Sequence, residues 1–417
     1  MAWLALPNLI RFTAMLKFLR RLALSVVVLL GLVVLWDVTT YDAPAWQADY
    51  RRLKTDMASG YANLDWMAQH RKLDILALDR QTTAAIDGAH SRVRAFLAIR
   101  RFIKAFKDPH FRMRVGDRPI VEAAPVVTPA EGDATEEEAF VDSPAGADCT
   151  AAGYEDANHA FVFPFARLPG WTPVRDGDFP TALIGDIGVL RIAQFGEDSY
   201  FGACEKVFKP GIGEYELKLA VRALQQEKLK QAIGELKSKG ATRLLIDISG
   251  NGGGTEWVDE VIALMTDHAM SREDARMVGP VCDRSGIWRG EPVCQVLQDA
   301  PERIQLQGTG VWTGPVLVLA DRGTGSASES MVAWLKLNHV ATIIGERTAG
   351  AGCGYVNGGT RTQFRASPFD VMMSNCARFL DDGTNEVEGI APDIEIPMHV
   401  EDATQQAAAL AAVLAKK

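Results

Sequence analysis

The feature that most constrains the fold is a junction that occurs twice, in which an apolar run passes through small residues into a helical pattern. The first junction spans residues 244–265 and contains three consecutive glycines, 252–254. The second spans residues 316–337 and contains Gly-Ser-Ala-Ser at 325–328. Buried strands that alternate with helices predict an α/β core with its ligand site at the strand ends.

The glycine loop of the first junction predicts close approach to a bound group. Consecutive glycines carry a large backbone-entropy cost, which is tolerated where φ is positive or where the backbone must contact something closely. Phosphate does not fit, because no Gly-Lys-Ser/Thr follows and the spacing differs from that of the dinucleotide fingerprint. A substrate carbonyl fits better, since backbone N–H groups of such a loop can hold its developing oxyanion.

The second junction offers a nucleophile. Ser326 follows a buried strand and opens a helix, where backbone N–H groups carry partial positive charge. The alternative interpretation is a helix start, because Ser326 or Ser328 with Glu329 behind it fits an N-cap.

Together the motifs resemble a known family. Their order is Asp-Ile-Ser-Gly-Asn-Gly-Gly-Gly at 247–254, Gly-Ser-Ala-Ser-Glu at 325–329, Ile-Gly-Glu-Arg-Thr-Ala-Gly-Ala-Gly at 344–352 and Glu-Gly-Ile-Ala-Pro-Asp at 388–393. The chain resembles the C-terminal processing (tail-specific) and tricorn-core serine proteases, whose core is similar to crotonase and the Clp protease. The resemblance implies that Ser326 is the nucleophile and that the N–H groups of Gly253 and Ala327 hold the oxyanion.

One position departs from the family pattern. Processing proteases carry a general-base lysine where this chain has Ala351, and alanine cannot accept a proton. In the tricorn-like branch a histidine from the preceding domain is the base, and a glutamate near Pro-Asp orients it. The resemblance then implies His110 as the base and Glu386 as the orienting carboxylate, with Glu388 as the alternative. The competing interpretation is a solvated turn histidine next to Pro109 and solvated loop carboxylates.

These residues predict a serine-type endopeptidase with a Ser-His-Glu arrangement that acts on exported peptides or proteins. No cofactor and no metal is expected, because no cysteine or histidine has metal-ligand spacing. The alternative is a non-catalytic binding protein, similar to the retinoid-binding relatives, that keeps the fold and holds an apolar or peptide ligand. A net charge of -9 gives no basic footprint for nucleic acid.

The domain organisation follows from pattern and composition. The chain has 417 residues and is 47% hydrophobic, enough for a sizeable core. Residues 122–156 hold many carboxylates and no Lys or Arg, which is typical of a solvated insertion. The expected order is a basic tail (1–21), a membrane segment (22–36), a small helical domain (46–116), an acidic, partly disordered insertion without a clear PDZ (117–183), the catalytic core (184–400), and a tail or helix (401–417).

The N-terminus and the cysteines indicate export. Basic residues precede the apolar run 22–36, which favours an uncleaved signal-anchor with the catalytic domain outside the cytoplasm, or a secreted protein if the run is a cleaved signal peptide. Six cysteines are consistent with disulfides, although connectivity does not follow from sequence. The most local pair is Cys282 with Cys294; Cys353 and Cys376 flank strand-like segments, which leaves Cys149 and Cys204.

Overall fold

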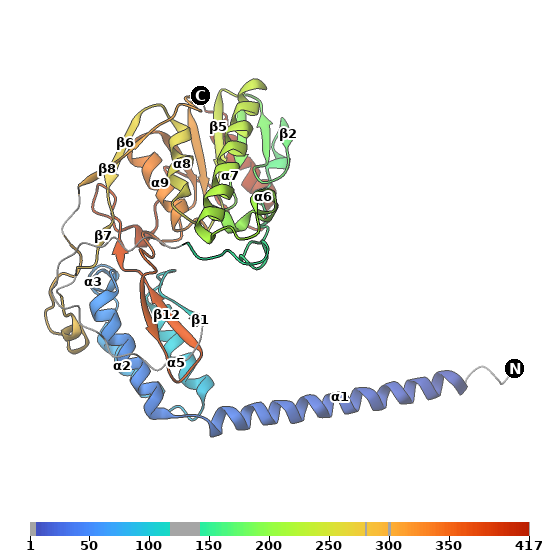
Figure 1. Cartoon of the computed structure of the whole chain (residues 1–417), viewed down its shortest axis with the longest axis vertical. Coiled ribbons are helices and arrows are strands. Elements are labelled where there is room, and N and C mark those ends of the chain that lie inside the picture. Colours follow the sequence, from blue (N-terminus) through green and yellow to red (C-terminus); the bar gives the residue numbers. More distant parts are fainter. Residues whose placement is uncertain (1–5, 117–141, 280–281, 299–301, 417) are drawn as a thin grey trace.

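The computed structural model describes residues 6–116, 142–279, 282–298 and 302–416. Residues 1–5 of the predicted basic tail and 117–141 of the predicted insertion lie outside the described residues. Figure 1 shows a projecting N-terminal helix, a helical part next to it, and an α/β part that contains the large sheet.

The α/β part is built on a seven-stranded sheet in the order β14-β10-β9-β5-β4-β3-β2. The five strands from β14 to β4 are parallel, whereas β3 and β2 add an antiparallel edge. The strands are β2 (Trp171–Arg175), β3 (Thr181–Ile184), β4 (Ile187–Arg191), β5 (Arg243–Asp247), β9 (Val316–Ala320), β10 (Ala341–Gly345) and β14 (Ile394–Glu395).

Alternate side chains of the central strands point to two apolar layers. Leu244 and Ile246 of β5 pack into the layer made with the helices α6 (Phe201–Val207), α7 (Glu214–Ser238), α8 (Trp257–Ile262) and α9 (Ala327–Leu337). Leu245 points to the other face, which is covered by α10 (Ala403–Leu414). A sheet buried on both faces explains why its strands are continuous apolar runs. The predicted α/β class is confirmed.

The predicted helical part is also confirmed. It consists of α2 (Ala43–Gly60), α3 (Leu64–Gln69), α4 (Ile75–Asp87) and α5 (Arg92–Ala105). The apolar residues that recur every three or four positions are all buried: Tyr50, Leu53, Met57, Tyr61, Leu64 and Met67. Helix α5 ends before Pro109, as the fixed φ of proline requires.

A second sheet joins the helical part to the α/β part. Strand β1 (Arg112–Val115) pairs antiparallel with β12 (Phe369–Met373), which in turn pairs with β11 (Thr360–Gln363). Two further ribbons complete the chain: β6 (Ala269–Glu273) with β8 (Arg303–Gln307), and β7 (Arg276–Met277) with β13 (Cys376–Ala377). The turn between α5 and β1 therefore lies where the two parts meet.

The main sheet extends beyond the predicted start of the core at residue 184. Strand β2 and most of β3 precede residue 184, and they extend the main sheet because each exchanges hydrogen bonds with the next strand. Residues 142–183 are packed rather than a loose insertion: Cys149 is linked to Cys204, and Phe163, Phe165 and Leu168 are buried beneath the sheet.

The three disulfides of the structure include the local pair that the spacing favoured and the two other pairs that the sequence left open. They join Cys149 to Cys204, Cys282 to Cys294, and Cys353 to Cys376. Disulfides persist in oxidising compartments, so these bonds suggest a location outside the cytoplasm.

The N-terminal helix α1 (Leu6–Thr39) projects away from the rest of the molecule (Figure 1). Its segment Leu19–Thr39 has a mean hydropathy of 2.4 and no buried residue. At 21 residues it is long enough to cross a bilayer. Length and composition fit a signal-anchor and a signal sequence equally, and the apolar segment is longer than the predicted 22–36.

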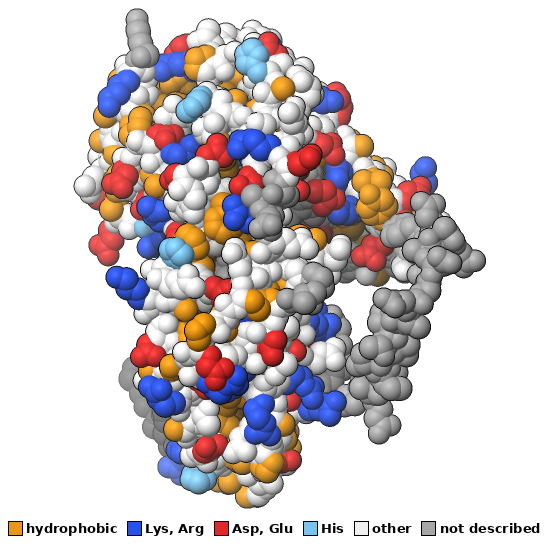
Figure 2. Space-filling model, turned by 90° about the vertical axis from the view of Figure 1, so that its left-hand side faces the viewer, with side chains coloured by type: hydrophobic (Ala, Val, Ile, Leu, Met, Phe, Trp, Pro, Cys, Tyr) orange, Lys and Arg blue, Asp and Glu red, His pale blue; other side chains and the backbone are white. Residues whose placement is uncertain are grey.

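The surface carries mixed charge. On the described part of the face drawn in Figure 2, Lys and Arg side chains are interspersed with Asp and Glu. This face offers no continuous basic area of the kind that binds a phosphate backbone.

Candidate active site

Ser326 occupies a strained backbone position between β9 and α9. Its φ of 55° and ψ of -117° lie in a region that non-glycine residues rarely adopt. Such strain costs about 1–3 kcal/mol and persists where surrounding contacts enforce it. Ser326 lines an open cavity of about 470 Å³, whereas Ser328 is fully buried and its hydroxyl has no hydrogen-bond partner among the described residues.

The buried carboxylate of Glu329 holds this turn in place. Its Oε2 accepts the N–H groups of Ser326 at 3.0 Å and Ala351 at 2.7 Å, while its Oε1 accepts the N–H of Gly350 at 2.7 Å. The hydroxyl of Thr348 also donates to Oε1. Burial raises the pKa of Glu329 to about 7, and these donors offset part of the rise. The residue predicted as a capping partner thus fixes the serine turn against the glycine-rich segment at 349–352.

The glycine loop lies against Ser326, as the two-junction pattern predicts. A Cβ at Gly253 would lie 2.7 Å from the Cβ of Ser326. However, the Gly253 N–H donates to the side-chain oxygen of Asn251 at 2.9 Å, so it is already engaged. Ala327 is the first residue of α9, and its N–H therefore has no partner within the helix. The Ala327 N–H has no hydrogen-bond partner among the described residues, whereas the Gly253 N–H is engaged by Asn251.

His110 lines the same cavity as Ser326. It lies in the turn between α5 and β1, where its N–H donates to Asp108 at 2.8 Å and its carbonyl accepts the Tyr355 hydroxyl at 2.6 Å. Its ring meets the Tyr355 ring edge to face at 4.9 Å. Gly354 lies so close that a Cβ there would be 2.8 Å from Cε1 of the imidazole. The histidine is thus held at the cavity rather than solvated on a surface turn.

Burial lowers the pKa of His110 below its ordinary value. The Asp108 carboxylate opposes this effect, while the positive charges of Arg112 and Arg378 add to it. A lowered pKa keeps the imidazole neutral at neutral pH, which is the form that can accept a proton.

The predicted contact between a glutamate and the His110 ring does not occur in this structure. Nδ1 of His110 is buried without a hydrogen-bond partner among the described residues. Glu386 is completely buried and binds Arg272 and Arg378 instead. Burial alone would raise the pKa of Glu386, but these two guanidinium groups outweigh it and hold the pKa below its ordinary value.

The alternative residue, Glu388, also points elsewhere. Its Oε1 accepts hydrogen bonds from Trp66 at 2.7 Å and Arg71 at 2.8 Å. Glu388 therefore ties the helical part to the α/β part. Glu386 retains an indirect link to the nucleophile, because Nη2 of Arg378 donates to the carbonyl of Ser326 at 3.2 Å.

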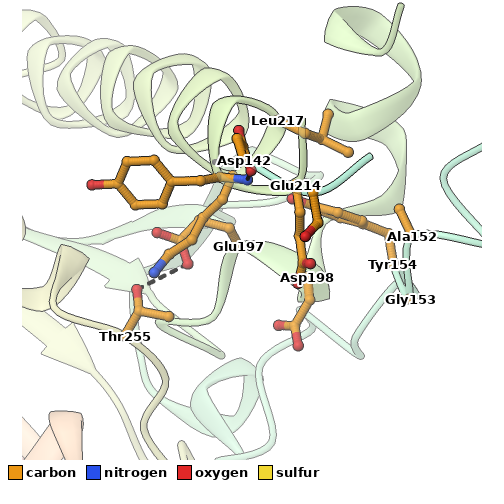
Figure 3. A pocket seen from close by; sticks show the side chains of 12 residues that line it. Asp142, Ala152, Gly153, Tyr154, Glu197, Asp198, Glu214, Leu217 and Thr255 are labelled. Carbon is orange, nitrogen blue, oxygen red and sulfur yellow. Dashed lines mark hydrogen bonds between the residues drawn. The ribbon is translucent and has the colours of Figure 1, made fainter. Parts of the chain in front are cut away.

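A second hollow of about 600 Å³ shares a lining residue with the first, and Figure 3 shows the side chains that line it. Thr255 lines both, and its hydroxyl donates to Glu197 at 2.9 Å, the dashed line of Figure 3. Asp198 and Glu214 line this second hollow together with Tyr154, which is 7% exposed. The cavity with the serine is therefore continued by an acidic one.

Sequence reasoning missed Asp108, Tyr355 and Arg378. Asp108 could have been found, because an Asp side chain in a turn often accepts the backbone N–H of the residue two positions later, which here is His110. Tyr355 and Arg378 carry no local signal, since they reach the cavity only through tertiary packing.

Residues 186–396 match the sequence profile of peptidase family S41. The tail-specific protease of Haemophilus influenzae is 27% identical over 187 residues, which cover 41% of this chain and 23% of that protein. This chain therefore spans about a quarter of the length of that relative.

Solved structures share the fold at low identity. Mature CPAF superposes with a TM-score of 0.57 at 15% identity, covering 88% of this chain and 95% of that chain. A proposed peptidase from Parabacteroides merdae gives 0.55 at 16% identity, covering 89% of this chain and 98% of that chain. The family match spans the glycine loop, the strained serine and the Pro-Asp motif, and on this ground the chain belongs to peptidase family S41.

Proposed function

We propose that this protein is a serine-type endopeptidase in which Ser326 is the nucleophile and His110 the general base. The observation that carries the proposal is that the strained Ser326 and the partly desolvated His110 line one cavity although they come from different parts of the fold. A serine hydroxyl needs an adjacent base near neutral pH. At the lysine position of the processing proteases this chain has Ala351, which cannot supply one.

In this mechanism Oγ of Ser326 attacks the peptide carbonyl as His110 takes its proton. His110 then returns the proton to the leaving amine, and water hydrolyses the ester in a second round. The Ala327 N–H holds the oxyanion. The Gly253 N–H joins it by exchanging Asn251 for the substrate oxygen, since catalytic hydrogen bonds often form only in the complex.

Glu386 takes part as a positioning residue. It neutralises Arg378, which binds the Ser326 carbonyl, so its carboxylate fixes the nucleophile turn rather than the imidazole. Removing it would leave the buried guanidinium of Arg272 and the partly buried one of Arg378 without their counter-charge, which is destabilising.

A fluorophosphonate probe tests the assignment. We expect the wild-type protein to be labelled once, and peptide mapping to place the label on Ser326, because only an activated serine reacts with this electrophile. A folded protein that remains unlabelled would support the alternative function, a binding protein of the same fold.

We also propose that the catalytic part lies outside the cytoplasm, anchored by α1 or released after its cleavage. A reporter that is active only outside the cytoplasm should be active when fused after residue 45. Non-reducing mass spectrometry should recover the pairs Cys149–Cys204, Cys282–Cys294 and Cys353–Cys376 from the native protein. Export would be contradicted if a cytoplasmic reporter fused at the same position were active and the six cysteines were recovered as free thiols.

A further inference from the structure

The cavity that holds Ser326 is lined by more carboxylates than cations. Its two arginines, Arg272 and Arg378, are both bound to Glu386, which does not line the cavity. The lining carboxylates are Glu256, Asp259, Glu273 and Asp274. Three of them have partners: Glu256 binds Arg222 and Lys218, Glu273 binds Arg276, and Asp274 accepts the N–H of Ala275.

Asp259 is the exception. It lies on α8, is partly buried, and its carboxylate has no hydrogen-bond partner among the described residues. Burial raises the pKa of Asp259, and Arg378 and Arg272 reduce the rise only in part. An acidic residue in the first turn of a helix interacts favourably with the helix dipole. This interaction alone does not explain why the Asp259 carboxylate lines the cavity. A desolvated carboxylate without a donor is costly, and a cationic ligand would relieve that cost.

Part of the cavity lining is apolar. Val258, Ile304, Ala327 and Trp334 line the same cavity as Asp259. Lysine and arginine combine an aliphatic stem with a charged end, so the stem can pack on such walls while the charge reaches a carboxylate. The cavity volume of about 470 Å³ lies within the range of small-ligand sites.

We propose that Asp259 is a specificity-determining residue that binds a lysine or arginine side chain of the peptide substrate. The inference rests on the proposed peptidase function and assigns its substrate class. A salt bridge to Asp259 would hold the substrate across the cavity that contains Ser326 and His110.

The neighbouring hollow of Figure 3 extends the same preference. Among the residues that line it, Asp198 and Glu214 have no basic partner among the described residues, and the hydroxyl of the nearly buried Tyr154 has no hydrogen-bond partner there. Because Thr255 borders both cavities, a peptide that leaves the first one meets a second acidic surface. Lys218 also lines this hollow but is paired with Glu256, so negative charge predominates there and would raise the local concentration of a cationic substrate.

The test uses the full chain and a positional-scanning set of internally quenched peptides. In each peptide one position carries lysine, norleucine or glutamate. At one position we expect the wild type to cleave the lysine peptide about 10–100-fold better in kcat/KM than the norleucine peptide, as for one charge-assisted hydrogen bond in a partly buried site. Asp259→Asn should reduce that ratio to about one while cleavage of the norleucine peptide persists.

Two further variants separate recognition from a structural role. Glu260→Gln removes the same charge from the next residue of α8, outside the cavity, and should keep the lysine preference. Asp259→Lys should reverse the preference toward glutamate at the same position, which loss of a helix-dipole contact would not produce. Equal ratios in the wild type and Asp259→Asn would overturn the proposal.

A binding arm keeps this test independent of turnover. The Ser326→Ala variant should bind a fluorescent lysine peptide more tightly than the matching norleucine peptide, as measured by fluorescence anisotropy. Adding Asp259→Asn to this variant should remove the difference in affinity. If the wild type cleaves no peptide but this difference exists, the peptidase function fails and the cationic site stands. Cleavage or binding without dependence on Asp259 removes the site and leaves the peptidase function intact.

Discussion

Ser326→Ala is expected to lower peptide hydrolysis by at least about 10³-fold, because alanine has no nucleophile and the triad members of serine proteases act as a unit. Thermal stability should fall by no more than the loss of one N-cap contact, about 1 kcal/mol. The Ser326 side chain forms a capping box with Glu329, but the Glu329 carboxylate binds the backbone N–H of Ser326, which alanine keeps. The measurement is kcat/KM on a quenched peptide, with the unfolding midpoint recorded on the same preparation.

Ser328→Ala is the matched control. Its side chain is two residues away, completely buried, and its hydroxyl has no hydrogen-bond partner among the described residues. Removing an unpaired buried hydroxyl leaves no partner unsatisfied, so activity and stability should both be close to wild type. If Ser326→Ala hydrolyses peptides fully, or if only Ser328→Ala loses hydrolysis, Ser328 rather than Ser326 is the nucleophile.

Much of the α/β core could be predicted, because its strands and helices leave local signals. The apolar runs at 244–246 and 316–320 are β5 and β9, and the long periodic segment at 215–239 is α7. The serine was found for the same reason: a small-residue turn between a buried strand and a helix is a local pattern. The disulfide between Cys282 and Cys294 is also local, and the sequence predicted it on spacing alone.

The remaining features depend on contacts between distant segments. The family resemblance pointed to Glu386, but its carboxylate binds Arg272 of β6. The periodicity of a sequence does not indicate an ion pair between residues so far apart in the chain. The N–H of Gly253 is engaged by Asn251 only because the loop folds back on itself. The main sheet extends before residue 184 because β3 pairs with β4 and β2 pairs with β3, although both strands lie outside the family motifs.

His110→Ala is the second change with a large expected effect. General-base assistance accelerates the reaction about 10²–10⁴-fold, so kcat should fall by a factor in that range or by more. The substitution leaves the backbone hydrogen bonds of His110 to Asp108 and Tyr355 in place, so the turn should keep its geometry. The control is His70→Ala, which removes an exposed imidazole stacked on Trp66 at 3.7 Å, outside the cavity, and should leave turnover unchanged.

The pH dependence of the wild type identifies the base directly. Only the neutral imidazole accepts the proton, so kcat/KM should fall as pH decreases through the pKa of His110. Burial lowers that pKa, and the opposing charge of Asp108 restores it only in part. The acid limb should therefore lie below the ordinary histidine value of about 6.5. It should be absent from the residual activity of His110→Ala. An acid limb at or above the ordinary value, or one that survives the substitution, would assign the proton to another group and remove His110 from the mechanism.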